Sequence, residues 1–246
     1  MSFRVVETKL DRGRVAKGLV EDAEASTPRQ NPIVVDFESP KLQHRLKNNA
    51  DGEAIVKAIG TKRSARSGLV VYDFTAGLGT EAFLLARAGF TVIAFERDGK
   101  VFELLEDGLQ RYRESELARG VEIESCLKLE FRWGEAVEQI EAGLRAGTLV
   151  RAHAVSLDPM FEGESTETKS LPKKEMALLR KMLPPSNDAG LRRMMTAAFS
   201  IADSRVIVKR PNGSIDLAAD DANGRPLRPA HRLEGKTARF DIYSCR

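Results

Sequence analysis

From residue 69 onward, short apolar runs typical of strands alternate with longer segments whose apolar residues recur at the helical spacing. This alternation predicts an α/β fold in which a parallel sheet is covered by helices on both faces. Residues 127–131 alternate apolar and polar side chains, which favours a place nearer the edge of the sheet. The predicted strands are 69–73, 91–95, 127–131, 152–157, 205–209 and 239–243, and the predicted helices are 80–88, a segment that begins after Asp98, 172–183 and 188–202.

The amino-terminal part of the chain is more polar and carries only short apolar stretches. Residues 26–32 predict a linker or exposed turn, residues 33–37 a strand, and residues 54–59 a short amphipathic helix. We therefore expect a small amino-terminal appendage over residues 1–66 and one large domain over residues 67–246. Within that domain, the polar stretch between the last two predicted strands indicates a long loop that is mobile or faces the substrate.

Composition narrows the class of protein. The 246 residues are 42% hydrophobic and 30% charged, which is ordinary for a globular protein. The amino terminus lacks an apolar signal core and no stretch reaches membrane-span length, so we expect a cytoplasmic protein without a membrane partner. The two cysteines and three histidines are too scattered for a metal site, and the thiols are expected to be reduced: Cys126, Cys245, His44, His153 and His231.

Charge is distributed unevenly along the chain. The net charge of +3 is the sum of +4 over residues 1–70, −8 over residues 71–170 and +7 over residues 171–246. An acidic middle between basic flanks suits a cationic cofactor and a polyanionic substrate. Charge runs alone more often do no more than solvate helices.

The apolar run that ends at Asp73 leads into a turn with two glycines and then into a helix. Gly77 and Gly79 permit backbone angles closed to other residues and let a ligand approach the main chain, while the helix start offers unpaired N–H groups. The pattern D-x-T-x-G-x-G differs from the dinucleotide fingerprint. A tight structural turn is the simpler interpretation of the glycines alone.

Such a turn could bind NAD, a phosphate group or S-adenosylmethionine, and acidic residues discriminate among them. Carboxylates repel a pyrophosphate but attract a sulfonium and an ammonium group. Glu96 closes the next predicted strand, nineteen residues after Gly77, where an acid can accept both ribose hydroxyls. With Asp73 also present, the pattern favours S-adenosylmethionine as cofactor.

The predicted strand 152–157 is followed by a peptide that could carry the chemistry. Ligands bind at the carboxyl ends of strands in open α/β sheets, so Asp158 is expected beside the Asp73 turn. Pro159 restricts the local backbone, and Phe161 offers a face on which a base could stack. Because methyl transfer to an amine depends mainly on alignment, Asp158 and a neighbouring carbonyl could hold the amine N–H groups. An isolated Asp-Pro more commonly begins a loop.

Several short motifs in one order resemble a known family: the bacterial small-subunit (16S) ribosomal RNA guanine-N2 methyltransferases of the J type. The resemblance covers most of the chain, from about residue 33 to residue 243. The motifs are Asp73–Gly79, Glu96-Arg97, Asp107–Leu109, Leu157–Phe161, Lys173–Met176 and Val206–Pro211. The resemblance implies a Rossmann-like class I methyltransferase sheet in residues 67–246, S-adenosylmethionine as cofactor, and methylation of a guanine exocyclic amine in ribosomal RNA or the small ribosomal subunit.

The resemblance also implies site residues and shows departures from the family pattern. Positions expected to contact the cofactor, besides Asp73 and the two glycines, are Thr80, Glu81, Glu96, Arg97, Gly134, Glu135 and Asp158. The family's usual Arg-Asp is replaced by Thr80-Glu81, its hydroxyl pair by Gly134-Glu135, its proline after Phe161 by Glu162, its histidine near the carboxyl terminus by Ala238, and its amino-terminal glycine-rich run by residues 48–51. These changes indicate a divergent member.

Basic residues that follow the strand ends are candidates for phosphate contact, although a bare lysine or arginine is more often a solvated charge. These candidates are Lys173, Lys174, Lys209 and Arg210, and His44 with Arg45 resembles a family motif. The alternatives left open are N-methylation of another nucleic acid or a small molecule, a noncatalytic RNA-binding protein on the same scaffold, and, least favoured, a dehydrogenase.

Overall fold

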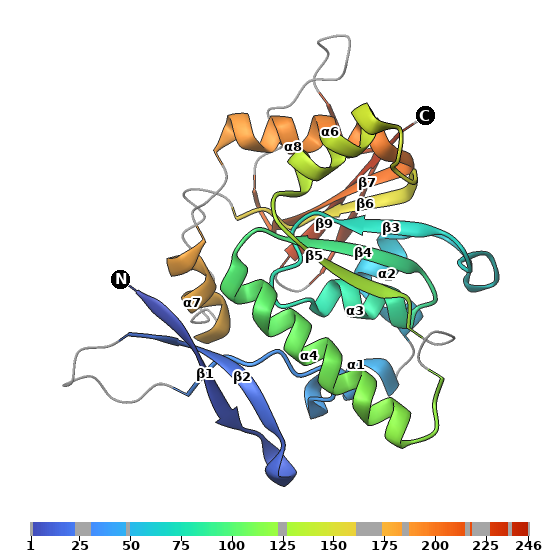
Figure 1. The fold of residues 1–246 in the computed structure, drawn as a ribbon. Helices are drawn as coiled ribbons and strands as arrows, with labels where there is room; N and C mark the ends of the chain where they lie inside the picture. The colour runs from blue at the N-terminus through green and yellow to red at the C-terminus, as the bar shows by residue number, and fades with distance from the viewer. Residues whose placement is uncertain are drawn as a thin grey trace.

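The computed structural model describes residues 2–22, 31–47, 50–122, 127–160, 174–183, 187–214, 217, 227–235 and 238–245. Its centre is a seven-stranded sheet in the order β5-β4-β3-β6-β7-β9-β8 (Figure 1). The first five strands in this order are parallel, and β9 runs antiparallel to both of its neighbours. The strands are β3 (Val70–Asp73), β4 (Thr91–Glu96), β5 (Leu129–Trp133), β6 (Ala152–Leu157), β7 (Ala202–Pro211), β8 (His231–Glu234) and β9 (Ala238–Ser244).

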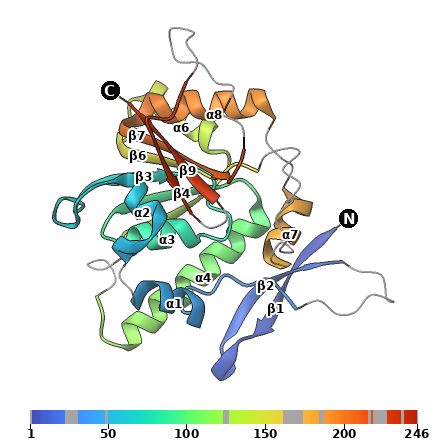
Figure 2. The same ribbon diagram turned by 180° about the vertical axis from the view of Figure 1, so that it is seen from behind.

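Helices cover both faces of the sheet, as the alternating pattern predicts. Figures 1 and 2 show α3 and α4 on one face and α6 and α8 on the other. Each face has its own apolar cluster, because the central strands bury side chains on both sides. The helices are α1 (Pro40–Lys47), α2 (Ala54–Ile59), α3 (Thr80–Arg87), α4 (Gly99–Ala118), α6 (Ala136–Ala146), α7 (Lys174–Met182) and α8 (Asp188–Ile201).

The order of the strands fixes where a ligand can bind. The chain runs from β3 outward through β4 to β5, then returns to the other side of β3 as β6 and continues to β7. The connections therefore leave β3 and β6 in opposite directions and open a crevice at their carboxyl ends. Asp73 ends β3 and Asp158 follows β6, so this crevice lies between the two predicted acids.

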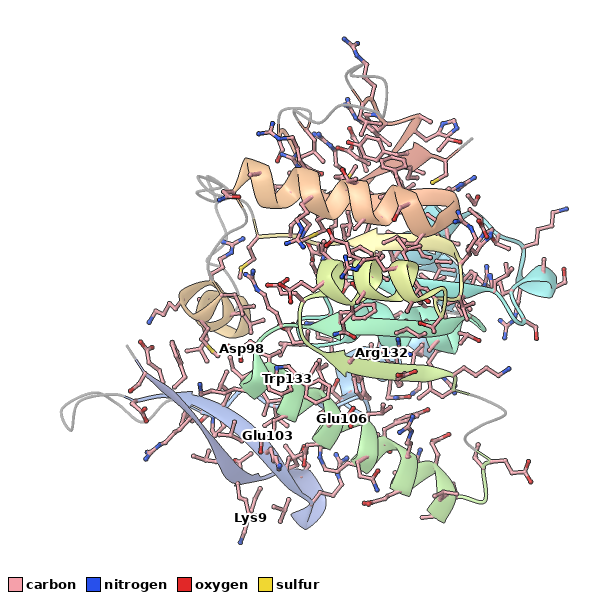
Figure 3. The ribbon with its side chains drawn as sticks, turned by 45° about the horizontal axis from the view of Figure 1, so that its top comes forward. Lys9, Asp98, Glu103, Glu106, Arg132 and Trp133 are labelled. Atoms are coloured by element: carbon pink, nitrogen blue, oxygen red, sulfur yellow. The ribbon has the colours of Figure 1, made fainter. Side chains whose placement is uncertain are left out.

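An antiparallel hairpin of β1 (Phe3–Lys9) and β2 (Val15–Glu21) lies beside the main sheet as a separate two-stranded sheet. It is anchored to α4, since the Lys17 backbone N–H donates to Asp107 at 3.1 Å and Lys17 Nζ lies 2.6 Å from Glu103. Figure 3 shows Lys9 at the end of the hairpin that points away from the sheet. Lys181 of α7 pairs with Glu21 at 2.8 Å, so α7 lies against the hairpin as well.

The strand predicted over residues 33–37 is wrong. Only one bridge forms there, between Ile33 and Leu19. The alternation instead reflects an extended segment that buries Ile33, Val35 and Phe37 in the core. Val35 passes so close to α4 that its carbonyl oxygen would lie 2.8 Å from a Cβ at Gly108, which explains the glycine in that helix.

The amino-terminal helix predicted over residues 54–59 is confirmed, and Gly60 ends it in the left-handed conformation at φ +72°. Its apolar residues belong to the same cluster as Phe83 and Leu84 of α3. The division predicted between an appendage over residues 1–66 and a domain over residues 67–246 stays a prediction, and residues of both parts contribute to one apolar core.

The other predicted elements that lie within the described residues agree with the structure to within a few residues, whereas β1, β2, α6 and β8 were not predicted. The third strand starts two residues later than predicted and lies at the sheet edge, as its alternation indicates. The predicted linker 26–32 lies mostly outside the described residues. Part of the predicted loop after β7 forms β8, which pairs with β9. Among the described residues, no helix is long and apolar enough to cross a membrane.

Candidate active site

A cavity of about 300 Å³ opens at the carboxyl ends of β3, β4 and β6. Polar and acidic residues form one part of its wall, and apolar side chains from α7, α8 and β9 form another. The residues predicted to bind the cofactor that line it are Asp73, Gly77, Thr80, Glu81, Glu96, Arg97, Gly134, Glu135 and Asp158. The structure thus brings together side chains from positions 73 to 158, as the strand order requires.

Asp73 holds the turn after β3 in place through a hydrogen bond from the backbone. Asp73 is 3% exposed, and its Oδ1 accepts the Thr75 backbone N–H at 3.1 Å. Burial raises the pKa of Asp73 to about 7; this hydrogen bond opposes the shift, whereas the charges of Glu81 and Asp158 add to it. Asp73 is therefore a poorly solvated acid that gains from a nearby positive charge.

The two glycines of the turn have different surroundings. Both have positive φ, +53° at Gly77 and +72° at Gly79, where a side chain is strained. Gly77 lines the cavity, and a Cβ there would meet only one atom, at 4.0 Å. A Cβ at Gly79 would instead lie 2.7 Å from Leu105 and 2.9 Å from Phe131. Gly77 is thus the residue that leaves room for a ligand, and Gly79 packs against the core.

Glu96 ties the turn to the start of α4. Its two carboxylate oxygens each accept a backbone N–H at 2.9 Å, one from Gly77 and one from Asp98. Burial raises the pKa of Glu96 to about 7, although these two hydrogen bonds oppose the shift. Each oxygen keeps a second lone pair, so the carboxylate can still accept hydroxyl groups.

The peptide after β6 is fixed against the same turn. The Asp158 backbone N–H donates to Thr75 Oγ1 at 2.6 Å, so the threonine hydroxyl joins the two loops. Sequence reasoning named Asp73 and the glycines and missed Thr75 as a site residue. The signal was present in the threonine of D-x-T-x-G-x-G.

Lys209, near the carboxyl end of β7, lies between two carboxylates of the site. Its Nζ is 2.7 Å from Asp158 Oδ2 and 3.1 Å from Glu81 Oε1. Burial alone would raise the pKa of Glu81, but Lys209 and Arg45 overcome this and hold it below its usual range. Partial removal from water raises the pKa of Asp158; Lys209 opposes this shift and Glu81 adds to it.

The far rim of the cavity is formed by residues after β4 and β5. Arg97 and Glu135 both line it, with Arg97 Nη1 3.5 Å from Glu135 Oε1. Trp133, directly before Gly134, is 66% exposed and is shown beside Asp98 at the start of α4 (Figure 3). A Cβ at Gly99 would lie 3.5 Å from the indole nitrogen, so the ring covers the first turn of that helix.

Apolar side chains form the part of the cavity that extends away from the turn. They are Pro159, Met160, Leu179, Leu183, Met194 and Phe240. Phe240 was not among the predicted site residues, because its strand is distant in sequence and its exposure of 6% makes it resemble an ordinary core residue. Phe161, the predicted stacking residue, lies outside the described residues.

The predicted phosphate contacts are placed in different settings. His44 is exposed on α1, while Arg45 lines the cavity and forms a bidentate pair with Glu53 at 3.1 and 2.5 Å. Lys209 faces carboxylates, and Arg210 is buried in β7 with 5% exposure. Lys173 lies outside the described residues, and only the backbone of Lys174 is described, as the first residue of α7.

Comparison with known proteins agrees with this geometry. The family described as "Putative SAM-dependent methyltransferase" matches residues 14–245. The ribosomal RNA small subunit methyltransferase J of Chromohalobacter salexigens is 37% identical over 86% of this chain and 76% of that protein, and the same enzyme of Alteromonas mediterranea is 35% identical over 94% and 81%. The chain belongs to the ribosomal RNA small subunit methyltransferase J family. A crystal structure of a SAM-dependent methyltransferase from Neisseria gonorrhoeae, 29% identical, matches 93% of this chain and 79% of that one with a TM-score of 0.63.

Membership of the methyltransferase J family confirms the Rossmann-like class I fold and S-adenosylmethionine as the cofactor. The residues at the turn fit that molecule. Gly77 leaves space at the main chain, Glu96 can accept hydroxyl groups, and the buried Asp73 favours a positive charge nearby. Among the described residues, no group of three or more potential ligands could hold a metal ion.

Proposed function

We propose that the protein methylates the exocyclic N2 amine of a guanine in small-subunit ribosomal RNA, with S-adenosylmethionine as donor. The names of its relatives support the substrate class. We expect it to act in the cytoplasm, where ribosomal RNA is assembled into subunits.

The observation that carries the proposal is the position of Asp158 between the two parts of the cavity. On one side lies the acidic turn, joined to it through Thr75, and on the other lies the apolar wall that includes Phe240 and Met194. A purine that leaves its stack can lie against such a wall while its polar edge faces the acid. The cavity therefore has one place for a cationic nucleoside and one for a flat base.

The residues around Asp158 suit an amine as acceptor. When bound, S-adenosylmethionine supplies a methyl group on a sulfonium, which is a good leaving group without acid catalysis. The guanine amine gains positive charge as it is methylated, and it must then lose a proton, for which the Asp158 carboxylate and solvent water are the available acceptors. The Asp158 carboxylate can accept an amine N–H and stabilise that charge, and Pro159 restricts the backbone that presents it. Alignment and a fixed acceptor are the main contributions of the chain.

Nucleoside analysis tests the proposal. Ribosomal RNA and small subunits are prepared from cells that lack the protein and are incubated with the purified protein and methyl-labelled S-adenosylmethionine. We expect label in N2-methylguanosine after digestion and chromatography with mass detection. Label in another nucleoside would show a different acceptor atom.

The noncatalytic and other-substrate alternatives predict different results in the same assay. An RNA-binding protein without activity would retain the RNA and bind the cofactor but give no label. A methyltransferase for DNA or for a small molecule would leave ribosomal RNA unlabelled, and would give label when DNA or a small-molecule extract replaces the RNA. The intact set of Asp73, Gly77 and Asp158 around one cavity favours catalysis over the noncatalytic alternative.

A further inference from the structure

The sequence predicts that Lys209 contacts phosphate, but the two carboxylates around it indicate a different role. The Lys209 side chain is 27% exposed. Its ammonium group lies within 3.1 Å of two carboxylates, that of Glu81 on α3 and that of Asp158 after β6. Moving it toward an RNA phosphate would leave Asp158 and Glu81 without this cation in a partly desolvated site. The side chains of Lys209 and Asp158 are 27% and 43% exposed, so the loss is smaller than for a fully buried pair, but it falls on two acids that repel each other.

We propose that Lys209 is a positioning residue that keeps the Asp158 carboxylate charged and oriented so that it can accept the amine of the substrate. This inference rests on the proposed function. Asp158 Oδ2 is the atom that Lys209 contacts, and Asp158 is also held at its backbone by Thr75. Among the described residues, the structure records a hydrogen bond to Oδ2 and none to Oδ1, which is thus left to accept an amine.

The need for a cation follows from the charges that face Asp158. Glu81 from α3 and Asp73 from β3 are negative when ionised, and both destabilise its ionised form. Lys209 from β7 and Arg180 from α7 act in the opposite direction, and Arg45 from α1 acts on Glu81. Among the described residues, Lys209 is the cation recorded in contact with Asp158, so its removal leaves two acids opposed by Arg180, which acts on Asp158 only through its charge.

Two variants separate this role from phosphate binding. Lys209→Met removes the charge and keeps a long apolar stem, and Lys209→Arg keeps the charge. Lys128→Met is the matched control, because Lys128 is exposed at the amino end of β5, away from the carboxyl ends of the strands. For each protein, kcat and the KM for RNA are measured from pH 5.5 to 9 at saturating cofactor, and the melting temperature and cofactor affinity verify folding.

We expect Lys209→Met to move the acidic limb of kcat upward by about 1 to 3 pH units. At a pH below both limbs, the rate then falls by about tenfold for each unit of the shift. The KM for RNA and its dependence on salt should change little. Lys209→Arg and Lys128→Met should keep the wild-type profile. An unchanged acidic limb combined with a raised, less salt-dependent KM for RNA would overturn the inference in favour of phosphate contact.

A second measurement does not depend on RNA activity. The carboxyl carbon of Asp158, assigned by comparison with Asp158→Asn, is titrated by NMR in the protein without RNA. We expect its midpoint to rise in Lys209→Met and to fall in Glu81→Gln, where the competing negative charge is gone. If neither midpoint moves, the inference is wrong even when the wild-type enzyme methylates RNA. If the midpoints move but the wild-type enzyme leaves RNA unlabelled, the proposed function fails instead.

Discussion

Asp73 and Glu96 are buried acids whose pKa values are both raised to about 7. A carboxyl with a raised pKa in the folded state stabilises the fold below its ordinary pKa, and this contribution is lost as the pH rises through the folded value. Without cofactor, stability should therefore decline between about pH 4 and pH 7. Both acids face the cavity in which we propose that the cationic cofactor binds, and its positive charge would offset this loss of stability at neutral pH.

The same two acids predict proton-linked cofactor binding. A cation favours their ionised forms, so binding of S-adenosylmethionine near pH 6.5 should release protons, and its affinity should increase up to about pH 7 and then level off. Calorimetry in two buffers with different ionisation enthalpies measures the release. Asp73→Asn should bind the cofactor more weakly and release fewer protons. An affinity that stays constant from pH 5.5 to 8 would contradict the assignment of these acids.

Asp158 is expected to matter for transfer more than for cofactor binding. Asp158→Ala removes the acceptor for the amine, and we expect kcat to fall by about 100-fold or more. The cofactor should still bind, because the turn and Glu96 are unchanged. Trp133 is the only tryptophan of the chain and directly precedes Gly134 on the cavity wall, so its fluorescence can report cofactor affinity. Loss of cofactor binding together with activity would place Asp158 in the cofactor site alone.

The turn between β3 and α3 contains two glycines that should respond differently to substitution. Gly79→Ala adds a Cβ 2.7 Å from Leu105 in addition to a strained φ, and we expect it to lower the free energy of unfolding by about 2 to 4 kcal/mol. Gly77→Ala has the strained φ without the clash and should cost about 1 to 2 kcal/mol. Its larger effect should be on cofactor affinity, because the new methyl group enters the cavity.

Urea unfolding and cofactor titration of both variants test this pair. Equal losses of stability would show that the core contact at Gly79 is unimportant. A Gly77→Ala variant that binds the cofactor as tightly as the wild type would show that the ligand does not approach that position.

The sheet was predictable because its central strands bury both faces. A mostly apolar segment such as residues 152–157, which is interrupted only by His153 and Ser156, predicts the strand with the bounds that the structure has. The hairpin β1–β2 was missed, since its strands are only partly buried and give no such run. Helix α6 was missed for a related reason, because it buries only Ala136, Val137 and Ile140. Residues 33–37 gave the opposite error, since alternation indicates a buried side and does not guarantee a neighbouring strand.

The site residues were predictable from the sequence where one local pattern contains all the residues that act together. Asp73, Gly77 and Glu96 fall within two successive strand ends, and their roles follow from local geometry. Lys209 is different, because its partners lie 128 and 51 residues earlier in the chain. Only the parallel order of β3, β6 and β7 places these residues together, so the sequence alone left Lys209 as an exposed cation.

In the folded molecule, the acidic and basic parts of the chain contribute to different parts of the cavity wall. The acidic middle supplies the carboxylates of the cavity, whereas basic residues from both flanks, Lys41, Arg45 and Lys209, line other parts of it. Lys41 of α1 lines the cavity from the amino-terminal flank. Arg180 of α7 lies close enough from the carboxyl-terminal flank for its charge to lower the pKa of Asp158. A cationic nucleoside and a polyanion can thus be bound by neighbouring parts of one surface.

We expect Lys41 and Arg180 to contact phosphates on either side of the methylated guanine. Both side chains are exposed, so neutral substitution should alter RNA binding with little effect on the fold. Lys41→Gln with Arg180→Gln should raise the KM for RNA several-fold and reduce the slope of log affinity against log salt by about 2. Measured at alkaline pH, where Asp158 is ionised with or without Arg180, kcat should stay near wild type. Filter binding at several salt concentrations measures the slope.

The matched control is Lys128→Gln with Arg145→Gln. These two exposed cations lie near the amino end of β5 and the end of α6, remote from the cavity, so the KM for RNA and the salt slope should stay unchanged. If the control pair weakens RNA binding as much as Lys41→Gln with Arg180→Gln does, general charge attracts the RNA and these two residues have no special part in placing it.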